Sequence, residues 1–580
     1  MRQWMVAAKK ADFYAIAEKF HVDPVVARII RNREVIGEKN IRIYLGGNLS
    51  DLSDPHQMKD MDRLVEILAQ KIRKQVRIRI IGDYDVDGVT SSHLFLMALR
   101  RVGAKVDVVI PHRIQDGYGL SLHLLQQAKE DGVDTILTCD NGIAAIDEIA
   151  WAKAQKMTVL VTDHHAVPFE EHEGRRTEKK SLADAVVNPH QQDCGYPYKE
   201  LCGAGVAWNV IRVLYENYDM DKREAEDLLD FVAMATVCDV MSLTGENRIL
   251  VKEGLKRIRH TKNIGLQALM QACNVQPENI SAYHFGYVLG PCVNATGRLD
   301  TARHALRLFE TGQETEAEEI ARDLVDLNQE RKELTLQGVE MAKKLCEEGG
   351  YENDPVLVLF LPDVHESIAG LIAGRIREMY NRPVFVLTRG EEGVKGSGRS
   401  TENYSMYENM CGCAELFTKF GGHPMAAGLS LPEENVEKFR RKINENCPLT
   451  VEEVCPDIHI DMAMPVGYAS TELVHQFALL EPFGKDNPSP LFADRNLSIS
   501  RMWVIGKNRN VLRMSVLSEY GQPVPVIFFG DVEMLFAYFT EKFGQKEVEN
   551  ALHGRKNRIL FSMVYTAKID FYQGNENLQL

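Results

Sequence analysis

The sequence predicts an α/β protein: a parallel-sheet domain, a connecting helix, a second and smaller α/β domain, and a C-terminal β-barrel. Three observations support this fold class. Apolar runs alternate with segments of helical period between about residues 62 and 245, which is typical of right-handed βαβ units. A long charged segment at about 314–347 is typical of a single connecting helix. Short strand-like runs recur after about residue 452, as in a small barrel or sandwich.

The first elements in the chain are an N-terminal segment and the parallel-sheet domain. Residues 1–60 carry no strong strand signal and are predicted to form a helical lead-in, while residues 61–245 are predicted to form the first domain. Helices are expected at segments such as 90–101 and 143–155, and strands at the apolar runs 76–81, 106–110, 135–138, 158–162 and 231–237. Ligands of such sheets bind at the carboxyl ends of the strands.

The remaining elements divide into three parts. Residues 246–350 are predicted to be a helical connector, residues 351–450 the smaller α/β domain, and residues 451–580 the barrel. In the smaller domain we expect strands at 356–361 and 384–388 around a helix at 366–380. The barrel strands are expected at 457–461, 496–505, 511–516, 524–529 and 559–570.

Composition excludes several classes of protein. The net charge of −15 argues against attraction of nucleic acid to the whole surface, although a local basic groove is compatible with it. The eleven cysteines are irregularly spaced and the first ten residues lack an apolar signal core, so we expect a cytoplasmic protein. No stretch reaches the ~18 apolar residues of a membrane span, so no membrane association is expected.

Four acidic clusters each follow an apolar run, and they predict one divalent-metal site. They are Asp83, Asp85 and Asp87; Asp140; Asp163 with His164 and His165; and Asp239. A single aspartate after a strand is more often a helix cap or a turn residue, and the histidine pair alone could be an exposed turn. Four such clusters at strand ends favour convergence. Mixed carboxylate and imidazole ligands favour Mn²⁺ or Mg²⁺, and a pair of ions with Asp140 as the bridge could hydrolyse a phosphodiester.

Two glycine-rich strings, 396–400 and 421–428, are either turns or phosphate-binding loops. Arg399 and His423 favour phosphate, because glycine lets backbone N–H groups approach an anion that a guanidinium then binds. The basic string Lys71–Arg79 is interpreted as a solvated helix end and strand edge without a binding role.

The motifs GDYDVDG, CDNG, TDHH and CDV resemble the four motifs of the DHH phosphoesterases. Further matches narrow the resemblance to the RecJ family of single-stranded-DNA exonucleases, from about residue 40 to the C-terminus. These matches are Pro111-His112-Arg113, Asp116-Gly117-Tyr118-Gly119, Asn294, Gly297-Arg298-Leu299, Gly396-Ser397-Gly398-Arg399-Ser400, and Gly421-Gly422-His423. The resemblance implies a DHH domain, a connecting helix, a DHHA1 domain and an OB fold that contains Glu481-Pro482-Phe483-Gly484.

The resemblance also implies roles for individual residues. Direct metal ligands would be Asp85, Asp87, Asp140, His164 and Asp239, with Asp83 and His165 beside them as further metal or phosphate contacts. The implied catalytic residues are Asp140, His164, His165 and His423. Substrate binding is implied for Arg113, Asn294, Arg298, Arg399, Ser400, Gly421, Gly422 and His423. Trp503, Phe528 and Phe529 are candidates for base stacking in the OB fold, although such aromatics are more often barrel core.

The activity that the resemblance implies is hydrolysis of single-stranded DNA from the 5′ end, with two Mn²⁺ or Mg²⁺ ions and release of 5′-mononucleotides, in DNA repair and recombination. A single-stranded-DNA-binding protein and a helicase are the implied partners. Three alternatives are weighed: a DHH phosphodiesterase for short oligonucleotides or cyclic dinucleotides, a non-catalytic DNA-replication scaffold, and an inorganic pyrophosphatase. The C-terminal module disfavours the first, the complete ligand set the second, and Ile81 in place of a histidine the third.

Three positions depart from the family pattern. Cys292 stands where relatives usually carry arginine, Val364-His365-Glu366-Ser367 replaces a commoner His-Pro-Gly-Val, and Asp486 replaces a usual glycine. None is an implied metal ligand, so the departures bear on affinity and processivity rather than on the reaction.

Overall fold

The computed structural model describes residues 3–113, 116, 119–172, 175–351, 354–390, 393–449, 457–506, 509–572 and 574–580. Gly117 and Tyr118 of the sequence motif lie outside the described residues. The chain forms two compact units. The first comprises Leu52–Met241 and Ile249–Pro456, and the second comprises Arg2–Asp51, Ser242–Arg248 and Asp457–Leu580.

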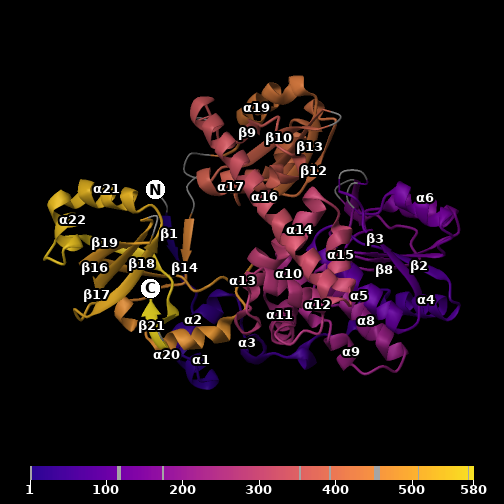
Figure 1. Cartoon of the computed structure of the whole chain (residues 1–580), viewed down its shortest axis with the longest axis horizontal. Coiled ribbons are helices and arrows are strands. Elements are labelled where there is room, and N and C mark those ends of the chain that lie inside the picture. The colour runs from indigo at the N-terminus through magenta and orange to yellow at the C-terminus, as the bar shows by residue number, and fades with distance from the viewer. Residues whose placement is uncertain are drawn as a thin grey trace. The chain divides into compact units, whose positions relative to one another are not determined.

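The first unit contains the predicted parallel sheet, whose β2, β3 and β8 are labelled in Figure 1. Its strand order is β3-β2-β4-β5-β8. The strands are β2 (Arg77–Ile81), β3 (Lys105–Val109), β4 (Thr135–Cys139), β5 (Thr158–Thr162) and β8 (Ala185–Val187). All of their pairings are parallel. After β2 the chain adds β3 on one side and β4 on the other, so the topology switches direction beside β2. Open α/β sheets bind ligands at the carboxyl edge of such a switch point.

Three helices matter most for the site: α5 (Val86–Arg101), α8 (Gly203–Asn217) and α10 (Leu229–Cys238). The strand predicted at 231–237 is wrong, because this run lies inside α10. An apolar run that is buried on every side has no periodicity to separate a strand from a helix, and residues 229–236 of α10 are all buried. Asp239 therefore follows a helix rather than a strand.

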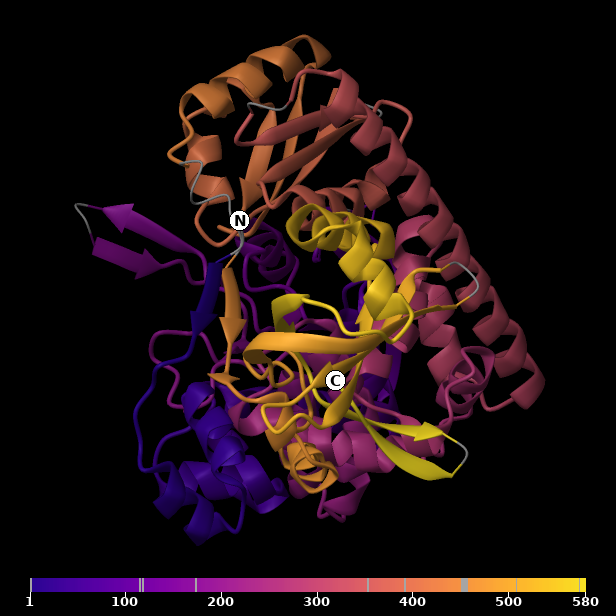
Figure 2. The same ribbon diagram turned by 90° about the vertical axis from the view of Figure 1, so that its left-hand side faces the viewer.

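A helical connector and a mixed sheet complete the first unit. The connector includes α12 (Ile264–Ala272), α14 (Gly290–Leu299) and the long helix α16 (Glu314–Glu348), which is 35 residues long and packs on both of them and on α17 (Ala369–Tyr380). Figure 2 shows α16 as a single straight rod. The mixed sheet has the order β12-β13-β11-β10-β9. Its strands are β9 (Leu357–Phe360), β10 (Val384–Gly390), β11 (Gly393–Arg399), β12 (Lys419–Gly422) and β13 (Ala426–Leu431).

The second unit is built on a bulged, mostly antiparallel sheet. Its central strand is β16 (Phe492–Ile505), which pairs with β15 (Met462–Ala463), β17 (Val511–Leu517) and β19 (Leu560–Tyr565), while β18 (Pro523–Phe529) pairs with β17. Register shifts in β16 between Ile499 and Arg501, and between Asp494 and Leu497, bend this strand, as expected when a sheet curls toward a barrel.

The N-terminal segment belongs to this second unit. Its helices α1 (Phe13–Phe20), α2 (Pro24–Asn32) and α3 (Glu38–Gly46) agree with the helical prediction. The sequence pattern missed a strand, β1 (Gln3–Val6), which pairs in parallel with β14 (Asp457–Ile460) (Figure 2). A four-residue strand is too short to show an alternating pattern.

Two buried arginines fix the N-terminal helices of the second unit. The Arg33 guanidinium binds both Asp461 oxygens at 2.7 and 3.0 Å. Arg248 is 1% exposed, donates to the carbonyls of Tyr44, Leu479 and Leu480, and lies 3.9 Å from the centre of the Tyr44 ring. Both contacts tie parts of the unit that are far apart in the sequence.

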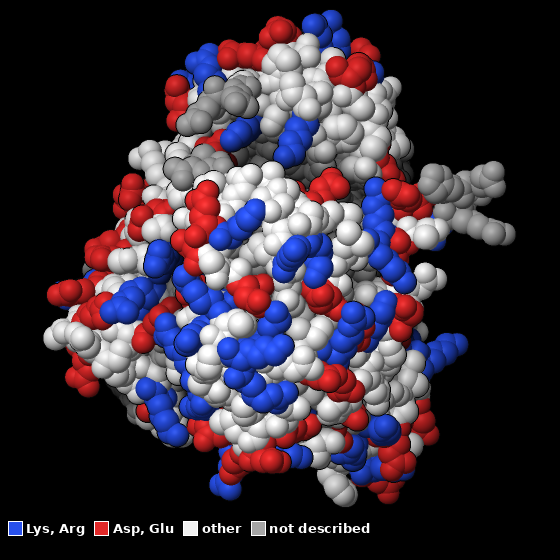
Figure 3. Space-filling view, turned by 90° about the vertical axis from the view of Figure 1, so that its right-hand side faces the viewer, with Lys and Arg blue, Asp and Glu red and all other residues white. Residues whose placement is uncertain are grey.

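The surface is mixed in charge. Figure 3 shows Lys and Arg interspersed with Asp and Glu over one face rather than gathered in a single basic patch. None of the described helices is long and apolar enough to cross a membrane.

Candidate metal centre and cationic pocket

The loop from β2 to α5 carries the first three carboxylates. Asp85 caps α5 by accepting a hydrogen bond from the Gly88 amide at 3.0 Å. A Cβ atom at Gly88 would lie 2.5 Å from the backbone N and O of Asp83, so only glycine permits this tight loop. The loop thereby buries the Asp83 and Asp87 side chains at the switch point of the sheet.

Asp140 follows β4, on the other side of the switch point. Its backbone has a φ of 61°, a left-handed conformation that is rare outside glycine and asparagine. The next residue holds the two loops together, since the Asn141 side chain donates to the carbonyl of Ile81 at 3.0 Å and its own carbonyl accepts from Thr138 Oγ1 at 2.8 Å. Strained backbone at a strand end is typical of functional sites.

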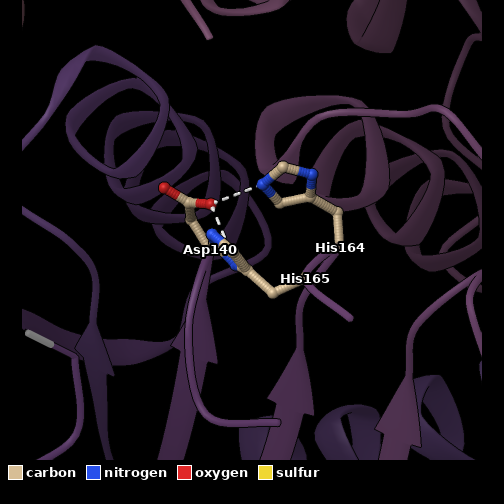
Figure 4. A group of neighbouring side chains, drawn as sticks. All are labelled: Asp140, His164 and His165. Carbon is tan, nitrogen blue, oxygen red and sulfur yellow. Dashed lines mark ion pairs between the residues drawn. The ribbon is translucent and has the colours of Figure 1, made fainter. Parts of the chain in front are cut away.

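His164 lies at the middle of the carboxylates. Its Nε2 atom is 3.1 Å from Asp140 Oδ1, 3.6 Å from Asp239 Oδ2 and 3.7 Å from Asp87 Oδ2. His165 Nδ1 lies 4.0 Å from the same Asp140 oxygen, and Figure 4 shows both imidazoles turned toward the Asp140 carboxylate. The site therefore unites the ends of β4, β5 and α10 with the loop after β2.

Among the described residues, three sets of side chains could each hold a metal ion, with ligand atoms within 4.8 Å of one another. The sets are Asp140, His164 and His165; Asp87, His164 and Asp239; and Asp83, Asp85 and Asp140. We call these seven residues the metal centre. Each residue predicted as a ligand lies in it. Asp140 and His164 each belong to two sets.

Asp163, to which the sequence analysis gave no role of its own, positions the histidines. Its Oδ1 accepts from His165 Nδ1 at 2.7 Å and from the His164 amide at 2.7 Å, and its Oδ2 accepts from the Ile143 amide at 2.9 Å. The signal was present in the sequence, because the aspartate directly precedes both histidines. A carboxylate that holds an imidazole in this way fixes its tautomer and orientation.

Asp87 is held by the start of helix α8. The amides of Gly203 and Ala204 donate to its two carboxylate oxygens at 2.6 and 2.8 Å. The partial positive charge at a helix N-terminus stabilises a buried carboxylate. Gly203 also permits close packing, since a Cβ atom there would lie 2.7 Å from the Cβ of Asp140.

The electrostatics of the centre favour a bound cation. Burial, followed by the neighbouring carboxylates, raises the pKa of Asp83 and of Asp140 well above the usual range and raises the pKa of Asp85. Burial lowers the pKa of His164. Burial also opposes protonation of His165, yet the Asp163 hydrogen bond and nearby carboxylates raise its pKa to about 9. A cluster of buried acids that repel one another is relieved by a divalent cation.

The donor set suits the metals that the sequence predicts. Asp83 Oδ1 is buried and has no hydrogen-bond partner among the described residues, and His164 Nε2 is buried among three carboxylates. Carboxylate oxygens with one or two imidazoles match Mn²⁺, and the oxygens alone match Mg²⁺. The metal centre can therefore hold either ion.

Beside the metal centre lies a pocket of about 460 Å³ with a strong positive charge. Among the described residues, its basic side chains are Arg113, Arg298, Lys395, Arg399 and Lys419, and its one acid is Glu366. We call it the cationic pocket. The Arg113 guanidinium lies 4.9 Å from the centre of the Tyr84 ring, and Tyr84 stands between Asp83 and Asp85, so the pocket adjoins the metal loop.

The arginines of the pocket are partly buried and close to one another. Arg298 Nη1 donates to the Ser367 carbonyl at 2.7 Å, and Arg399 Nη1 donates to the Gly398 carbonyl at 2.8 Å. Burial, followed by repulsion from Arg113 and other arginines, lowers the pKa of Arg298 to about 10 and also lowers the pKa of Arg399. Uncompensated guanidinium groups of this kind bind phosphate bidentately.

Not every residue predicted to bind substrate lines the pocket. Asn294 instead accepts from the Val86 amide at 3.1 Å, which supports the metal loop. The Ser400 hydroxyl is buried and donates to the Tyr404 carbonyl at 2.5 Å. Gly421 lines the pocket, whereas Gly422 and the exposed His423 lie beyond its lining.

The three departures from the family pattern have local explanations. Cys292 is buried, with its Sγ 3.8 Å from Cys273 Sγ and accepting from Asn328 Nδ2 at 3.4 Å. Glu366 pairs with Lys395 at 2.8 Å inside the cationic pocket. Asp486 adopts a φ of 59°, the conformation that glycine provides elsewhere.

The candidate aromatics of the barrel are not equivalent. Trp503 is half-buried under the Arg501 guanidinium, and Phe528 packs against the core. Phe529 is 71% exposed, so it alone among the three presents a free ring face.

Comparison with known proteins identifies the class first. Residues 77–236 match the DHH family N-terminal domain, residues 353–447 the DHHA1 domain, and residues 460–580 the RecJ OB domain. The fold predicted from sequence is thereby confirmed. The protein is a member of the DHH family that carries its metal centre at the switch point of the sheet.

More particularly, the chain belongs to the RecJ family of single-stranded-DNA-specific exonucleases. It is 32% identical to that exonuclease of Haemophilus influenzae over 96% of this chain and 95% of the relative. It is 33% identical to the Bacillus subtilis protein over 88% of this chain, which spans 63% of that relative. A crystal structure of RecJ from Thermus thermophilus in complex with Mn²⁺ matches the whole chain and 78% of its own length, with a TM-score of 0.80 and 25% identity.

Proposed function

We propose that this chain degrades single-stranded DNA from the 5′ end and releases 5′-mononucleotides, with two divalent ions at the metal centre, in DNA repair and recombination. The observation that carries the direction of cleavage is the cationic pocket, which adjoins the metal loop at Arg113 and Tyr84. A terminal 5′-phosphate held there would place the next phosphodiester at the metals. An internal phosphodiester has nucleotides on both sides. A pocket that binds a terminal phosphate therefore favours cleavage at the end of a strand over cleavage within it.

The residues divide between two ion positions. Asp83, Asp85 and Asp140 would hold one ion, and Asp87, His164 and Asp239 the other, while Asp140 also lies in a set with His164 and His165. Divalent ions bound in this way supply an activated water and stabilise charge on the attacked phosphate.

The remaining side chains orient His165 and bind the phosphates of the substrate. Asp163 holds His165 by its Nδ1 atom at 2.7 Å, which fixes the orientation of this imidazole beside Asp140. We assign it the task of binding the phosphate or the metal ion beside Asp140. Arg113, Arg298 and Arg399 would bind the 5′-phosphate.

The test compares one oligonucleotide sequence as a 5′-phosphorylated single strand, as a 5′-hydroxyl single strand and as a duplex, together with a dinucleotide and cyclic di-AMP. The wild type with Mn²⁺ should release mononucleotides in order from the 5′ end of the phosphorylated single strand, and Asp140→Ala should be inactive. Arg113→Ala should lose the preference for the phosphorylated end. Equal activity of wild type and Asp140→Ala, or a preference for the dinucleotide, would overturn the proposal.

The implied partners, a single-stranded-DNA-binding protein and a helicase, stay predictions from the sequence, as does the cytoplasmic location. A pull-down of each partner from purified components is the direct test.

A further inference from the structure

The cationic pocket is longer than a single phosphate requires. Three of its lining side chains lie in register across neighbouring strands: Lys395 of β11 is opposite Ser430 of β13, which is opposite Lys419 of β12. Alternate residues of a strand share one face, so Lys395 lies on the same face as Arg399. Four residues of extended strand separate the two by roughly 13 Å.

These positions give the pocket two ends. The near end, with Arg113 and Arg399, adjoins the metal loop, and we have assigned it the terminal phosphate. The far end carries Lys395 and Lys419, which have no part in that assignment. Lys419 has no acidic partner within ion-pair distance among the described residues, while Lys395 binds Glu366 at 2.8 Å.

The charge of the pocket exceeds that of a terminal monophosphate. The five basic side chains and one acid that line it among the described residues give a net charge of +4. A phosphate monoester brings about −1.5 to −2 at neutral pH, so half of the positive charge is left without an anion. Repulsion between the arginines makes that excess costly.

The floor between the two ends is open. The next register column consists of Ser397, Gly428 and Gly421. A Cβ atom at Gly421 would meet no atom within 4 Å, and one at Gly428 would meet only a carbonyl oxygen at 4.0 Å. Small residues and a hydroxyl leave room for an anion and donors to bind it.

We propose that the pocket accepts strands with a 5′-diphosphate or 5′-triphosphate, the outer phosphates lying between Lys395 and Lys419. This inference rests on the proposed 5′-end function and extends its substrate class. The reaction at the metals is unchanged: water attacks the phosphorus of the second nucleotide, and the 3′-oxygen of the first leaves and takes up a proton. The first product is an intact nucleoside 5′-triphosphate, and the shortened strand carries a 5′-monophosphate.

The test uses one DNA sequence with a 5′-hydroxyl, a 5′-monophosphate or a 5′-triphosphate, and the products are separated by anion-exchange chromatography. We expect one nucleoside triphosphate per strand, released first and followed by monophosphates, at a rate within about tenfold of the monophosphorylated strand. A second series with a terminal ribonucleotide distinguishes a DNA end from an RNA end. If the triphosphorylated strand resists degradation, or yields pyrophosphate instead, the triphosphate inference is wrong and the proposed 5′-end function still stands. If the protein degrades 5′-monophosphate and 5′-hydroxyl strands equally well, the proposed function is wrong as well.

Substitutions at the far end distinguish binding of the outer phosphates from binding of the terminal monophosphate. Lys419→Ala should lower kcat/KM for the triphosphorylated strand by about tenfold, the value of one charge-assisted contact, and lower it less for the monophosphorylated strand. Lys419→Arg should restore the ratio. Glu366→Gln frees Lys395 and should shift the ratio toward the triphosphate. Lys438→Ala, at an exposed site of the same domain, is the matched control. Equal losses on both strands would show that Lys419 serves the terminal nucleotide rather than the outer phosphates.

Discussion

The Asp163 carboxylate accepts a 2.7 Å hydrogen bond from Nδ1 of His165, while the neighbouring His164 presents Nε2 to Asp140 at 3.1 Å. One aspartate thus orients two consecutive histidines that face the same carboxylate from different angles. The imidazole orientations depend on a residue that is not itself in the metal centre.

Asp163→Asn should weaken the centre without removing a ligand. Asp163 accepts four hydrogen bonds on its two oxygens, and the single oxygen of the amide cannot accept all of them in the same geometry. His165 thereby loses its orientation and the carboxylate that raises its pKa. Loss of an outer partner of this kind costs about 10- to 100-fold in metal affinity or activity. Mn²⁺ titration by calorimetry and single-turnover cleavage measure the two effects. Unchanged values for both would show that the backbone alone orients the histidines.

Gly203→Ala should displace Asp140. The new Cβ would lie 2.7 Å from the Asp140 Cβ and 2.9 Å from its Oδ1, so the carboxylate or the start of α8 must shift. We expect at least a tenfold loss of Mn²⁺ affinity, by the same argument as for outer partners. Gly374→Ala is the matched control, because a Cβ at this helical glycine meets no atom within 4 Å. That control should be neutral or stabilising by up to about 1 kcal/mol; a Gly203→Ala protein with normal affinity would contradict the packing argument.

Asp140→Asn should abolish Mn²⁺-induced stabilisation but stabilise the metal-free protein. Burial and the adjacent carboxylates raise the pKa of Asp140, so ionising it in the absence of metal costs folding free energy. Asparagine removes that charge and tolerates the left-handed backbone at this position. In wild type, Mn²⁺ at 100 times its Kd should add about 2.7 kcal/mol to the free energy of unfolding, and EDTA should reverse it. Urea unfolding with and without Mn²⁺ measures the free energy of unfolding of both proteins in both states. A metal-free variant that is less stable than metal-free wild type would contradict the repulsion between Asp140 and its neighbouring carboxylates.

His93 should make the first unit sensitive to acid. It is 1% exposed and packs with its ring centre 4.6 Å from that of Phe231 and 5.8 Å from that of Phe309. Burial lowers its pKa from 6.5 to about 3. Between these values the unfolded chain binds a proton that the folded chain does not, so stability falls as the pH drops from about 6.5 toward 3, by up to ~1.4 kcal/mol per unit. His93→Leu should flatten this slope in urea unfolding between pH 7 and pH 5. A slope that is identical in both proteins would assign the acid sensitivity to other groups.

The sequence predicted the metal centre more completely than the fold around it. Acidic residues after Ile81, Cys139 and Thr162 could be placed at one edge because parallel strands end together. Asp239 was grouped with them for the wrong reason, since its apolar run is a helix buried on all sides. The role of Gly203 could not be predicted, because the helix that it begins meets Asp87 across 116 residues of sequence. Contacts over such distances leave no local pattern.

The cationic pocket, in contrast, could be predicted from the sequence only in part. Arg113 and Arg399 were found through short motifs, but Lys395 and Lys419 carry no motif and meet only through the register of β11, β13 and β12. Ser400 was also found through a motif, but the structure places its hydroxyl away from the pocket lining. It stands beside Arg399 in the sequence, yet alternate residues of an extended chain point to opposite sides, and its hydroxyl is buried against Tyr404.

The pairing of β1 with β14 also sets an order of events during synthesis. Residues 3–6 leave the ribosome before their partner strand, and most of the core of their unit lies beyond residue 456. The N-terminal helices therefore lack most of their packing partners while the first unit is synthesised. We expect the early segment to be cleaved by protease in ribosome-bound chains that end before residue 457 and to be protected once the whole chain is released, which pulse-proteolysis of stalled nascent chains measures directly.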